Sequence, residues 1–183
     1  GGHFLRALLR TTPEDTFDCQ PLVHEEANLL LLFDGRLDNR EELGFQLGMS
    51  ATNLRNLPDS ALALYAVLRW GKEAPARFVG DFALACWQPS RRRLWLTRDA
   101  MGSRSLYWHL NGRQLAFSSS ARSLLTLPSI KPAIDEARMH DHLCLLPQLG
   151  TESFFQGISR VEPGHVVEFV DGRQTSNFSH QDF

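Results

Sequence analysis

The chain has 183 residues, of which 43% are hydrophobic, enough to bury one substantial core or two layers of sheet within a single domain. Its 19 basic and 21 acidic side chains leave a net charge of −2 without a basic stripe, which argues against a nucleic-acid partner. Apolar runs such as Leu29 to Phe33 are far shorter than the ~20 residues of a membrane-spanning helix, so no membrane segment is expected.

Residues 1–19 are weakly patterned, and they show neither an initiator Met nor a signal peptide, so we expect a processed or truncated start. The leucines between residues 5 and 9 fit a short helix or a strand equally well. The apolar run from Asn28 to Phe33 predicts a strand that ends in a tight turn at Asp34 and Gly35. A helix over residues 38–48 is expected to follow, with acidic side chains in its first turn.

A second helix carries the clearest start and stop signals. Asp59 or Ser60 is expected as its N-cap, and Gly71 as the residue that closes it. Its expected apolar face consists of Ala61, Leu64, Tyr65 and Leu68. A short helical link from Glu73 to Phe78 then leads to the next strands.

The stretch from Phe78 to Ser120 holds four strand signals, which we interpret as a meander of antiparallel strands. The four runs are Phe82–Trp87, Arg93–Arg98, Ser105–Leu110 and Gln114–Phe117. Asn111 and Gly112 predict a hairpin turn between the last two, because both residue types tolerate positive φ. Asp99 to Gly102 is the expected link between the two hairpins.

The rest of the chain predicts two helices, one strand and a tail. The expected ranges are 119–127 and 135–146 for the helices and 164–170 for the strand. Asp171 and Gly172 signal a hairpin-type turn, after which residues 171–183 are interpreted as a linker. Antiparallel strands with helices inserted between them indicate an α+β domain, in which helices cover two stacked sheets.

Two polar positions are candidates for ligand binding. The polar end of the first strand, Asp34 to Arg36, can direct backbone N–H groups and a side chain at a ligand, although the same pattern is typical of an ordinary turn. Asp59 can cap the second helix or bind a substrate ammonium group, and the two roles are compatible.

Other reactive side chains carry weaker signals. Cys19, Cys86 and Cys144 are odd in number and widely spaced, which favours a reducing compartment, and hence the cytoplasm, over a disulfide framework. Cys86 lies in an apolar run and is expected to be an inert, buried thiol. His140 and His142 would lie on different sides of a helix, so no metal site is expected. No glycine-rich loop predicts ATP binding.

Six short motifs follow one another in an order known from one family. They are Gln20–Leu22, Phe33–Asn39, Phe78–Trp87, Arg98–Tyr107, Ser118–Leu124 and Gly157–His165. Together they resemble the N-terminal class II glutamine amidotransferase domain, of the N-terminal nucleophile type, found in the asparagine synthetase family. The likeness covers residues 20–170, which we interpret as the domain.

This resemblance implies a four-layer α/β/β/α sandwich of two mostly antiparallel sheets. It also implies a mechanism in which the thiol of an N-terminal Cys attacks the side-chain amide of glutamine, while an Asn side chain and a Gly N–H hold the oxyanion. The ammonia travels to a C-terminal synthetase domain that activates a carboxylate with ATP and Mg²⁺. That domain is the implied partner, reached through the linker at 171–183, and this chain itself is expected to hold no cofactor.

Several positions depart from the family pattern. No Cys stands at the N-terminus, and only 19 residues precede Gln20, so no catalytic residue is assigned. Asp34 replaces the oxyanion Asn, and Arg36 replaces a Glu that contacts the substrate ammonium, whereas Gly35 and Asp59 are retained. These four residues are therefore interpreted as vestigial glutamine-pocket positions.

The chain is thus expected to be the inactive amidotransferase-like domain of an ATP-dependent amide-forming enzyme, an arrangement similar to that of β-lactam synthetases and lasso-peptide cyclases. Arg98, Asp99 and His165 are candidate contacts with the synthetase domain, or ordinary turn residues. Glutamine, or a carboxylate or amine substrate of the parent enzyme, would be the small-molecule partner. The alternatives are a glutamine-hydrolysing asparagine synthetase fragment that lost its N-terminal Cys, and a free-standing binding module.

Overall fold

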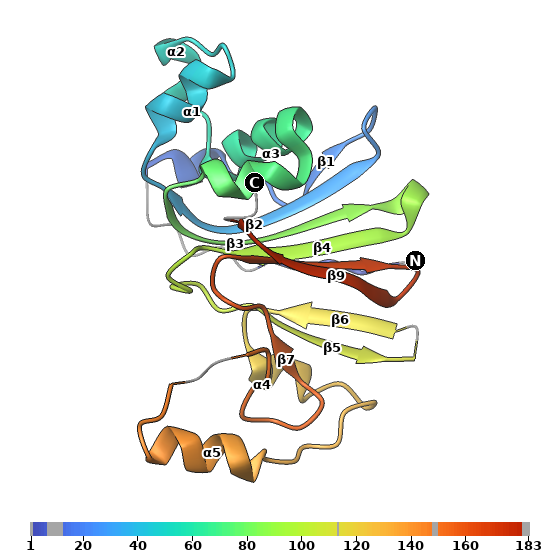
Figure 1. Cartoon of the computed structure of the whole chain (residues 1–183). Coiled ribbons are helices and arrows are strands. Elements are labelled where there is room, and N and C mark those ends of the chain that lie inside the picture. The colour runs from blue at the N-terminus through green and yellow to red at the C-terminus, as the bar shows by residue number, and fades with distance from the viewer. Residues whose placement is uncertain (1, 7–12, 113, 148–149, 181–183) are drawn as a thin grey trace.

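The computed structural model describes residues 2–6, 13–112, 114–147 and 150–180. These residues form four layers, in which helices cover the outer faces of two stacked sheets (Figure 1). The strand pairs of both sheets are antiparallel. The predicted α+β fold, a four-layer α/β/β/α sandwich, is therefore confirmed.

Within the described residues, the large sheet has six strands and the small sheet has three. The large sheet runs in the order β1 (Leu22–His24), β2 (Leu29–Leu37), β3 (Gly80–Gln88), β4 (Arg93–Arg98), β8 (His165–Val170), β9 (Arg173–Ser179). The small sheet runs in the order β6 (Gln114–Ser118), β5 (Tyr107–Asn111), β7 (Ser159–Arg160). The helical segments are η1 (Pro13–Phe17), α1 (Arg40–Gln46), α2 (Ala51–Leu54), α3 (Asp59–Trp70), η2 (Gly71–Arg77), η3 (Pro89–Arg91), α4 (Ala121–Leu124) and α5 (Glu136–Leu143).

A hydrophobic core lies at each boundary between the layers. The core beneath α3 groups Leu62 with Leu31 of β2. The core between the sheets groups Leu96 of β4 with Leu106, and the core behind the small sheet includes Leu124 of α4. Burial of these apolar side chains is the main term that stabilises the stacked layers.

Strand β3 is buried on both of its faces. Phe82, Leu84 and Cys86 belong to the core beneath α3, whereas Ala83 and Ala85 belong to the core between the sheets. A strand that is covered on both sides needs no polar face, which explains the continuous apolar run in its sequence. The strand predictions for β3, β4, β6 and β8 are confirmed, and β5 begins at Tyr107, two residues later than predicted.

The prediction of one four-stranded meander is wrong, because its two hairpins belong to different sheets. β3 and β4 pair in the large sheet, and β5 and β6 pair in the small sheet. The link that begins at Asp99 therefore passes from one sheet to the other. Asp99 is only 1% exposed, and its carboxylate accepts hydrogen bonds from Ser103 N at 2.9 Å and Arg104 N at 3.1 Å.

The prediction of a tight turn at Asp34 and Gly35 is also wrong, because β2 continues through both residues to Leu37. Gly35 lies opposite Phe82 in the β2–β3 pair and has φ +151°. A Cβ atom at Gly35 would lie 2.0 Å from the carbonyl oxygen of Asp81. Glycine is thus needed here for the close approach of two strands rather than for a turn.

The interpretation of residues 171–183 as a linker is wrong for Arg173–Ser179, which form strand β9. β9 pairs with β8 along its length after the predicted turn at Asp171 and Gly172. His180 N then donates to Gly164 O at 2.7 Å and keeps the chain on the sheet. Residues 181–183, like the leucines between residues 7 and 9, lie outside the described residues.

The helix predictions are confirmed in type but differ in detail. α3 ends at Gly71 as predicted, but its N-cap position is Pro58. Its most buried apolar side chains are Leu62, Ala63, Ala66 and Val67, whereas Tyr65, which was expected on the apolar face, is 44% exposed. Asp135, at the predicted start of this helix, is the N-cap of α5 and accepts a hydrogen bond from Arg138 N at 3.1 Å. α4 is shorter than predicted, and α2 was not predicted.

Candidate functional site

A cavity of about 210 Å³ lies between the two sheets. Most of its walls are apolar, and polar groups enter from the N-terminal segment, β2 and the end of β6. The lining residues are Leu5 and Arg6, 32–34 of β2, 83–85 of β3, Leu106, and 117–119. A concave, mostly apolar site with a few polar groups is the usual form of a small-molecule site.

Asp34 brings a carboxylate to this cavity. Successive side chains of a strand point to opposite faces, so Phe33 enters the core beneath α3 and Asp34 faces the space between the sheets. Within the described part of the chain, the Asp34 carboxylate has neither a hydrogen-bond nor an ion-pair partner. The cavity therefore contains an acceptor that is open to a ligand.

Arg6 lies on the same cavity, but its charge is balanced from behind. Arg6 Nη1 donates to Asp18 Oδ2 at 2.8 Å, and Gln20 Nε2 donates to the same oxygen at 2.8 Å. Gln20 Nε2 also donates to Phe33 O at 2.9 Å, and Ser60 Oγ donates to Asp18 Oδ1 at 2.8 Å. These contacts fasten the N-terminal segment to β2 and α3, a role that the Gln20 motif did not reveal in the sequence.

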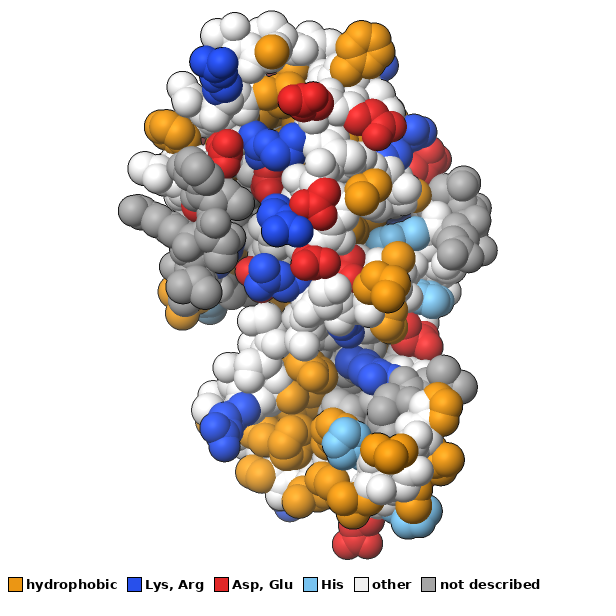
Figure 2. All heavy atoms as spheres, turned by 90° about the vertical axis from the view of Figure 1, so that its left-hand side faces the viewer, with side chains coloured by type: hydrophobic (Ala, Val, Ile, Leu, Met, Phe, Trp, Pro, Cys, Tyr) orange, Lys and Arg blue, Asp and Glu red, His pale blue; other side chains and the backbone are white. Residues whose placement is uncertain are grey.

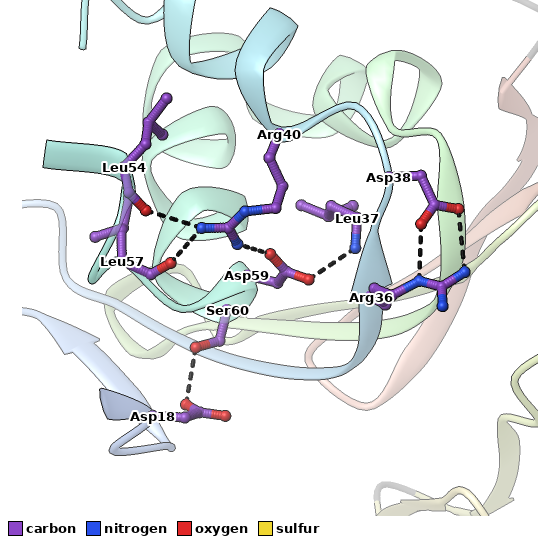
Figure 3. A network of polar contacts seen from close by, with 9 residues as sticks. All are labelled: Asp18, Arg36, Leu37, Asp38, Arg40, Leu54, Leu57, Asp59 and Ser60. Carbon is purple, nitrogen blue, oxygen red and sulfur yellow. Dashed lines mark hydrogen bonds and ion pairs between the residues drawn. The ribbon is translucent and has the colours of Figure 1, made fainter. Parts of the chain in front are cut away.

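Asp59 belongs to a buried polar network outside the cavity (Figure 3). It is 5% exposed, and its carboxylate accepts hydrogen bonds from Leu37 N at 2.8 Å and from the Arg40 guanidinium. Arg40 also donates to Leu54 O at 2.9 Å and Leu57 O at 2.7 Å. Burial raises the pKa of Asp59, and the Leu37 N–H and Arg40 only partly offset that effect. The carboxylate thus joins β2, α1 and α3, and each of its two oxygens accepts a hydrogen bond.

Arg36 turns away from the predicted pocket. Its Nε lies 2.7 Å from Asp38 Oδ1, and the two side chains are 53% and 49% exposed (Figure 3). Of the four predicted pocket positions, Asp34, Gly35, Arg36 and Asp59, Asp34 lines the cavity. Gly35 serves the β2–β3 contact, and Arg36 and Asp59 are engaged with other partners.

Arg98 and Asp99 direct their side chains to partners within the described residues, and their contact with a synthetase domain stays a prediction. Arg98 is 8% exposed and donates to Val161 O at 3.2 Å and to Gly102 O. Burial lowers the pKa of Arg98, and Asp99 partly offsets this. Burial alone would raise the pKa of Asp99, but the N–H groups of Ser103 and Arg104 bring it below its usual value.

His165, the third candidate contact, remains half-buried at the surface, with Nδ1 2.9 Å from Pro163 O, so its contact with a synthetase domain stays a prediction.

The role of His180 was missed in the sequence. Its Nε2 lies 2.6 Å from Thr97 Oγ1, and its ring stacks on Phe82 with centroids 6.3 Å apart. Burial, with a smaller contribution from His165, lowers the pKa of His180 to about 4. Its local sequence contains no signal for this position.

The cysteines are free thiols, and Cys19 and Cys144 are exposed. Cys86 is fully buried, which confirms the prediction of a buried thiol, and burial raises the pKa of Cys86 to about 12. Across residues 2–6, 13–112, 114–147 and 150–180, no group of three His, Cys, Asp or Glu side chains is placed to hold a metal ion. In the same part of the chain, no helix has the length and apolar character needed to cross a bilayer.

Exposed apolar side chains gather near α5, in the lower part of Figure 2, whereas charges of both signs alternate over the upper part. α5 has no buried residue. Ile134, Leu143 and Leu145 are 53%, 75% and 89% exposed. We call these three residues the α5 patch.

Known proteins resemble this chain in sequence and fold. The profile of the glutamine amidotransferase domain matches residues 6–180. Asparagine synthetase [glutamine-hydrolyzing] 3 of Bacillus subtilis (strain 168) is 26% identical over 141 residues, which cover 76% of this chain and 23% of that protein. Amidase chry2 of Gibberella zeae is 23% identical over 166 residues, which cover 91% of this chain and 24% of the amidase.

A solved structure of glutamine phosphoribosylpyrophosphate amidotransferase from B. subtilis, complexed with ADP and GMP, has a TM-score of 0.55 at 16% identity. The match covers 88% of this chain and 31% of that chain, and it supports the fold alone. The chain spans about a quarter of the length of the two sequence relatives above. Because the profile match extends over nearly all of its residues, the chain belongs to the class II glutamine amidotransferase domains of the asparagine synthetase family.

Proposed function

We propose that this domain does not hydrolyse glutamine and that it forms part of an ATP-dependent amide-forming enzyme. The unpartnered Asp34 carboxylate in the cavity between the sheets is the observation that carries this proposal. An oxyanion that develops beside a carboxylate is repelled, whereas an amide donor at the same position would stabilise it by about 3 kcal/mol. Arg36 is a cation where the family has a Glu, and it is paired with Asp38. The Asp59 carboxylate is bound to Leu37 N and to Arg40, so it is not free to bind a substrate ammonium group.

ATP and Mg²⁺ would act in a synthetase domain of the same parent chain, which would activate a carboxylate and join it to an amine. The asparagine synthetases among the relatives support this assignment, since the similarity covers about a quarter of each. The free thiols of Cys19, Cys86 and Cys144 support a reducing compartment such as the cytoplasm.

The test is ammonia release from glutamine by the full-length parent protein in the absence of ATP. We expect no ammonia above the rate without protein, while the Bacillus subtilis asparagine synthetase serves as the positive control. Release that saturates with glutamine and changes in Asp34→Asn would contradict the proposal and favour the glutamine-hydrolysing alternative. If the full-length protein releases no ammonia from glutamine and also forms no amide from ATP, a carboxylate and an amine, the result would favour the free-standing binding module.

The α5 patch is the surface that we propose for contact with the synthetase domain. α5 has no buried residue. Leu143 and Leu145 are 75% and 89% exposed, and a partner that covered these apolar side chains would remove them from water. The greater length of the sequence relatives supports a partner within the same chain.

In the full-length protein, we expect the double substitution Leu143→Ser and Leu145→Ser to speed proteolytic cleavage between the domains at least several-fold. Phe45→Ser is the matched control, because Phe45 is 84% exposed on α1, in the opposite outer layer. Equal cleavage rates in the double variant and the control would show that the α5 patch is not the interdomain surface.

A further inference from the structure

We propose that the cavity between the sheets binds a small primary ammonium ion through Asp34. The inference rests on the proposed function in one respect, since a cavity that does not turn over glutamine is available to another ligand. Asp34 supplies a carboxylate that no described side chain neutralises, at a site that the apolar residues Leu32, Leu106 and Phe117 partly shield from water. A charge-assisted hydrogen bond is stronger in such surroundings than in bulk water.

The charges around the cavity favour a cation. Arg6 is the basic residue of the lining, and its guanidinium is paired with Asp18 at 2.8 Å. Arg36 follows Asp34 on the same face of β2, but it is paired with Asp38 at 2.7 Å. The Arg98 guanidinium is directed to the carbonyl oxygens of Val161 and Gly102. Asp34 is thus left as the uncompensated charge of the described lining.

The other lining groups define the ligand class. An ammonium group has three N–H donors, and Ser118 and Ser119, two residues whose hydroxyl oxygens can accept hydrogen bonds, line the cavity together with Asp34. The apolar lining suits a short alkyl chain behind the ammonium group. The volume of about 210 Å³ favours a small ligand, of the size of a short alkylammonium ion.

Two other ligand classes fit less well. A hard metal cation takes at least six oxygen ligands, usually from several carboxylates, and the described lining contributes one carboxylate. An anion or a free amino acid would bring a carboxylate into the cavity, where Asp34 repels it and Arg6 is already paired with Asp18. A monocationic amine is the class that matches both the charge and the volume.

The experiment titrates the complete chain with n-butylammonium chloride at constant ionic strength and follows amide chemical shifts by NMR. We expect saturable shifts at residues 32–34, 83–85 and 117–119. Asp34→Asn should weaken binding at least about tenfold, because it removes the charged partner of the ammonium group. Asp171→Asn is the matched control and should bind as wild type, since the Asp171 side chain is 64% exposed and does not line the cavity. The neutral isostere 1-butanol should not bind.

Equal affinity in wild type and Asp34→Asn, or shifts that never saturate, would overturn this inference. The glutamine assay measures ammonia release rather than ammonium binding, so each proposal can be contradicted without the other. A protein that binds butylammonium and still releases ammonia from glutamine would overturn the proposed function alone. A protein that does neither would overturn the ammonium site alone.

Discussion

Asp59→Ala should lower the free energy of unfolding by about 3 to 5 kcal/mol, the range observed when one partner of a buried ion pair is removed. Asp59 is 5% exposed, and without it the guanidinium of Arg40 and the N–H of Leu37 lose their acceptor. Arg40, whose side chain is 22% exposed, would keep its hydrogen bonds to Leu54 O and Leu57 O but would lose its counter-charge. The junction between β2, α1 and α3 would then be the weakest part of the domain.

Urea denaturation followed by circular dichroism measures this loss. Asp38→Ala is the matched control, because it removes a carboxylate from the exposed ion pair with Arg36 and should leave the urea midpoint unchanged. Asp59→Asn keeps an acceptor for Leu37 N but removes the charge, so its urea midpoint should lie between those of the wild type and of Asp59→Ala. If Asp59→Ala does not fold, Asp59→Asn provides the measurement instead. Equal midpoints for Asp59→Asn and Asp38→Ala would show that the buried pair contributes no net stability.

Local sequence signals predicted most helices and strands, because side-chain periodicity and turn residues act over a few positions. They did not reveal which hairpins share a sheet, since β3–β4 and β5–β6 have the same local pattern but pair in different sheets. Gly35 has the signature of a turn residue, and only the approach of Asp81 from another strand explains it. The polar sequence of β9 resembles a linker because β9 is an edge strand whose side chains are largely exposed.

The candidate site was predictable only in part, for a related reason. The motif order pointed to the strand that carries Asp34, and the structure brings this residue to the cavity. The remaining assignments depended on partners that are distant in the sequence. Asp59 is bonded to Leu37, 22 residues earlier, and Arg98 to Val161, 63 residues later. Composition and spacing do not identify such partners, so buried structural roles were interpreted as binding roles.

His180 should make the domain lose stability as the pH falls from 6.5 toward 4. Burial, together with His165, lowers the pKa of His180 from 6.5 to about 4, so the unfolded chain binds this proton first and protonation favours unfolding. The stabilisation is complete above pH 6.5 and declines below it. Each pH unit corresponds to about 1.4 kcal/mol, so the loss between pH 6.5 and 4.5 should be about 2 to 3 kcal/mol.

The measurement is the unfolding free energy from urea titrations at pH 7.5, 6.5, 5.5 and 4.5. This pH range separates the protonation of His180 from that of Glu168. Burial would raise the pKa of Glu168, but its bonds to Lys72, Ser176 and Arg93 outweigh burial and bring the pKa below 4.5. The stability that Glu168 contributes is present above its usual pKa and is lost at lower pH. His180→Asn should be less stable at pH 7.5, because it loses the stacking on Phe82, but its stability should vary less with pH. His140→Asn, at a histidine whose side chain is 72% exposed, should keep the wild-type slope. An unchanged slope in His180→Asn would show that another group binds the proton that drives acid unfolding.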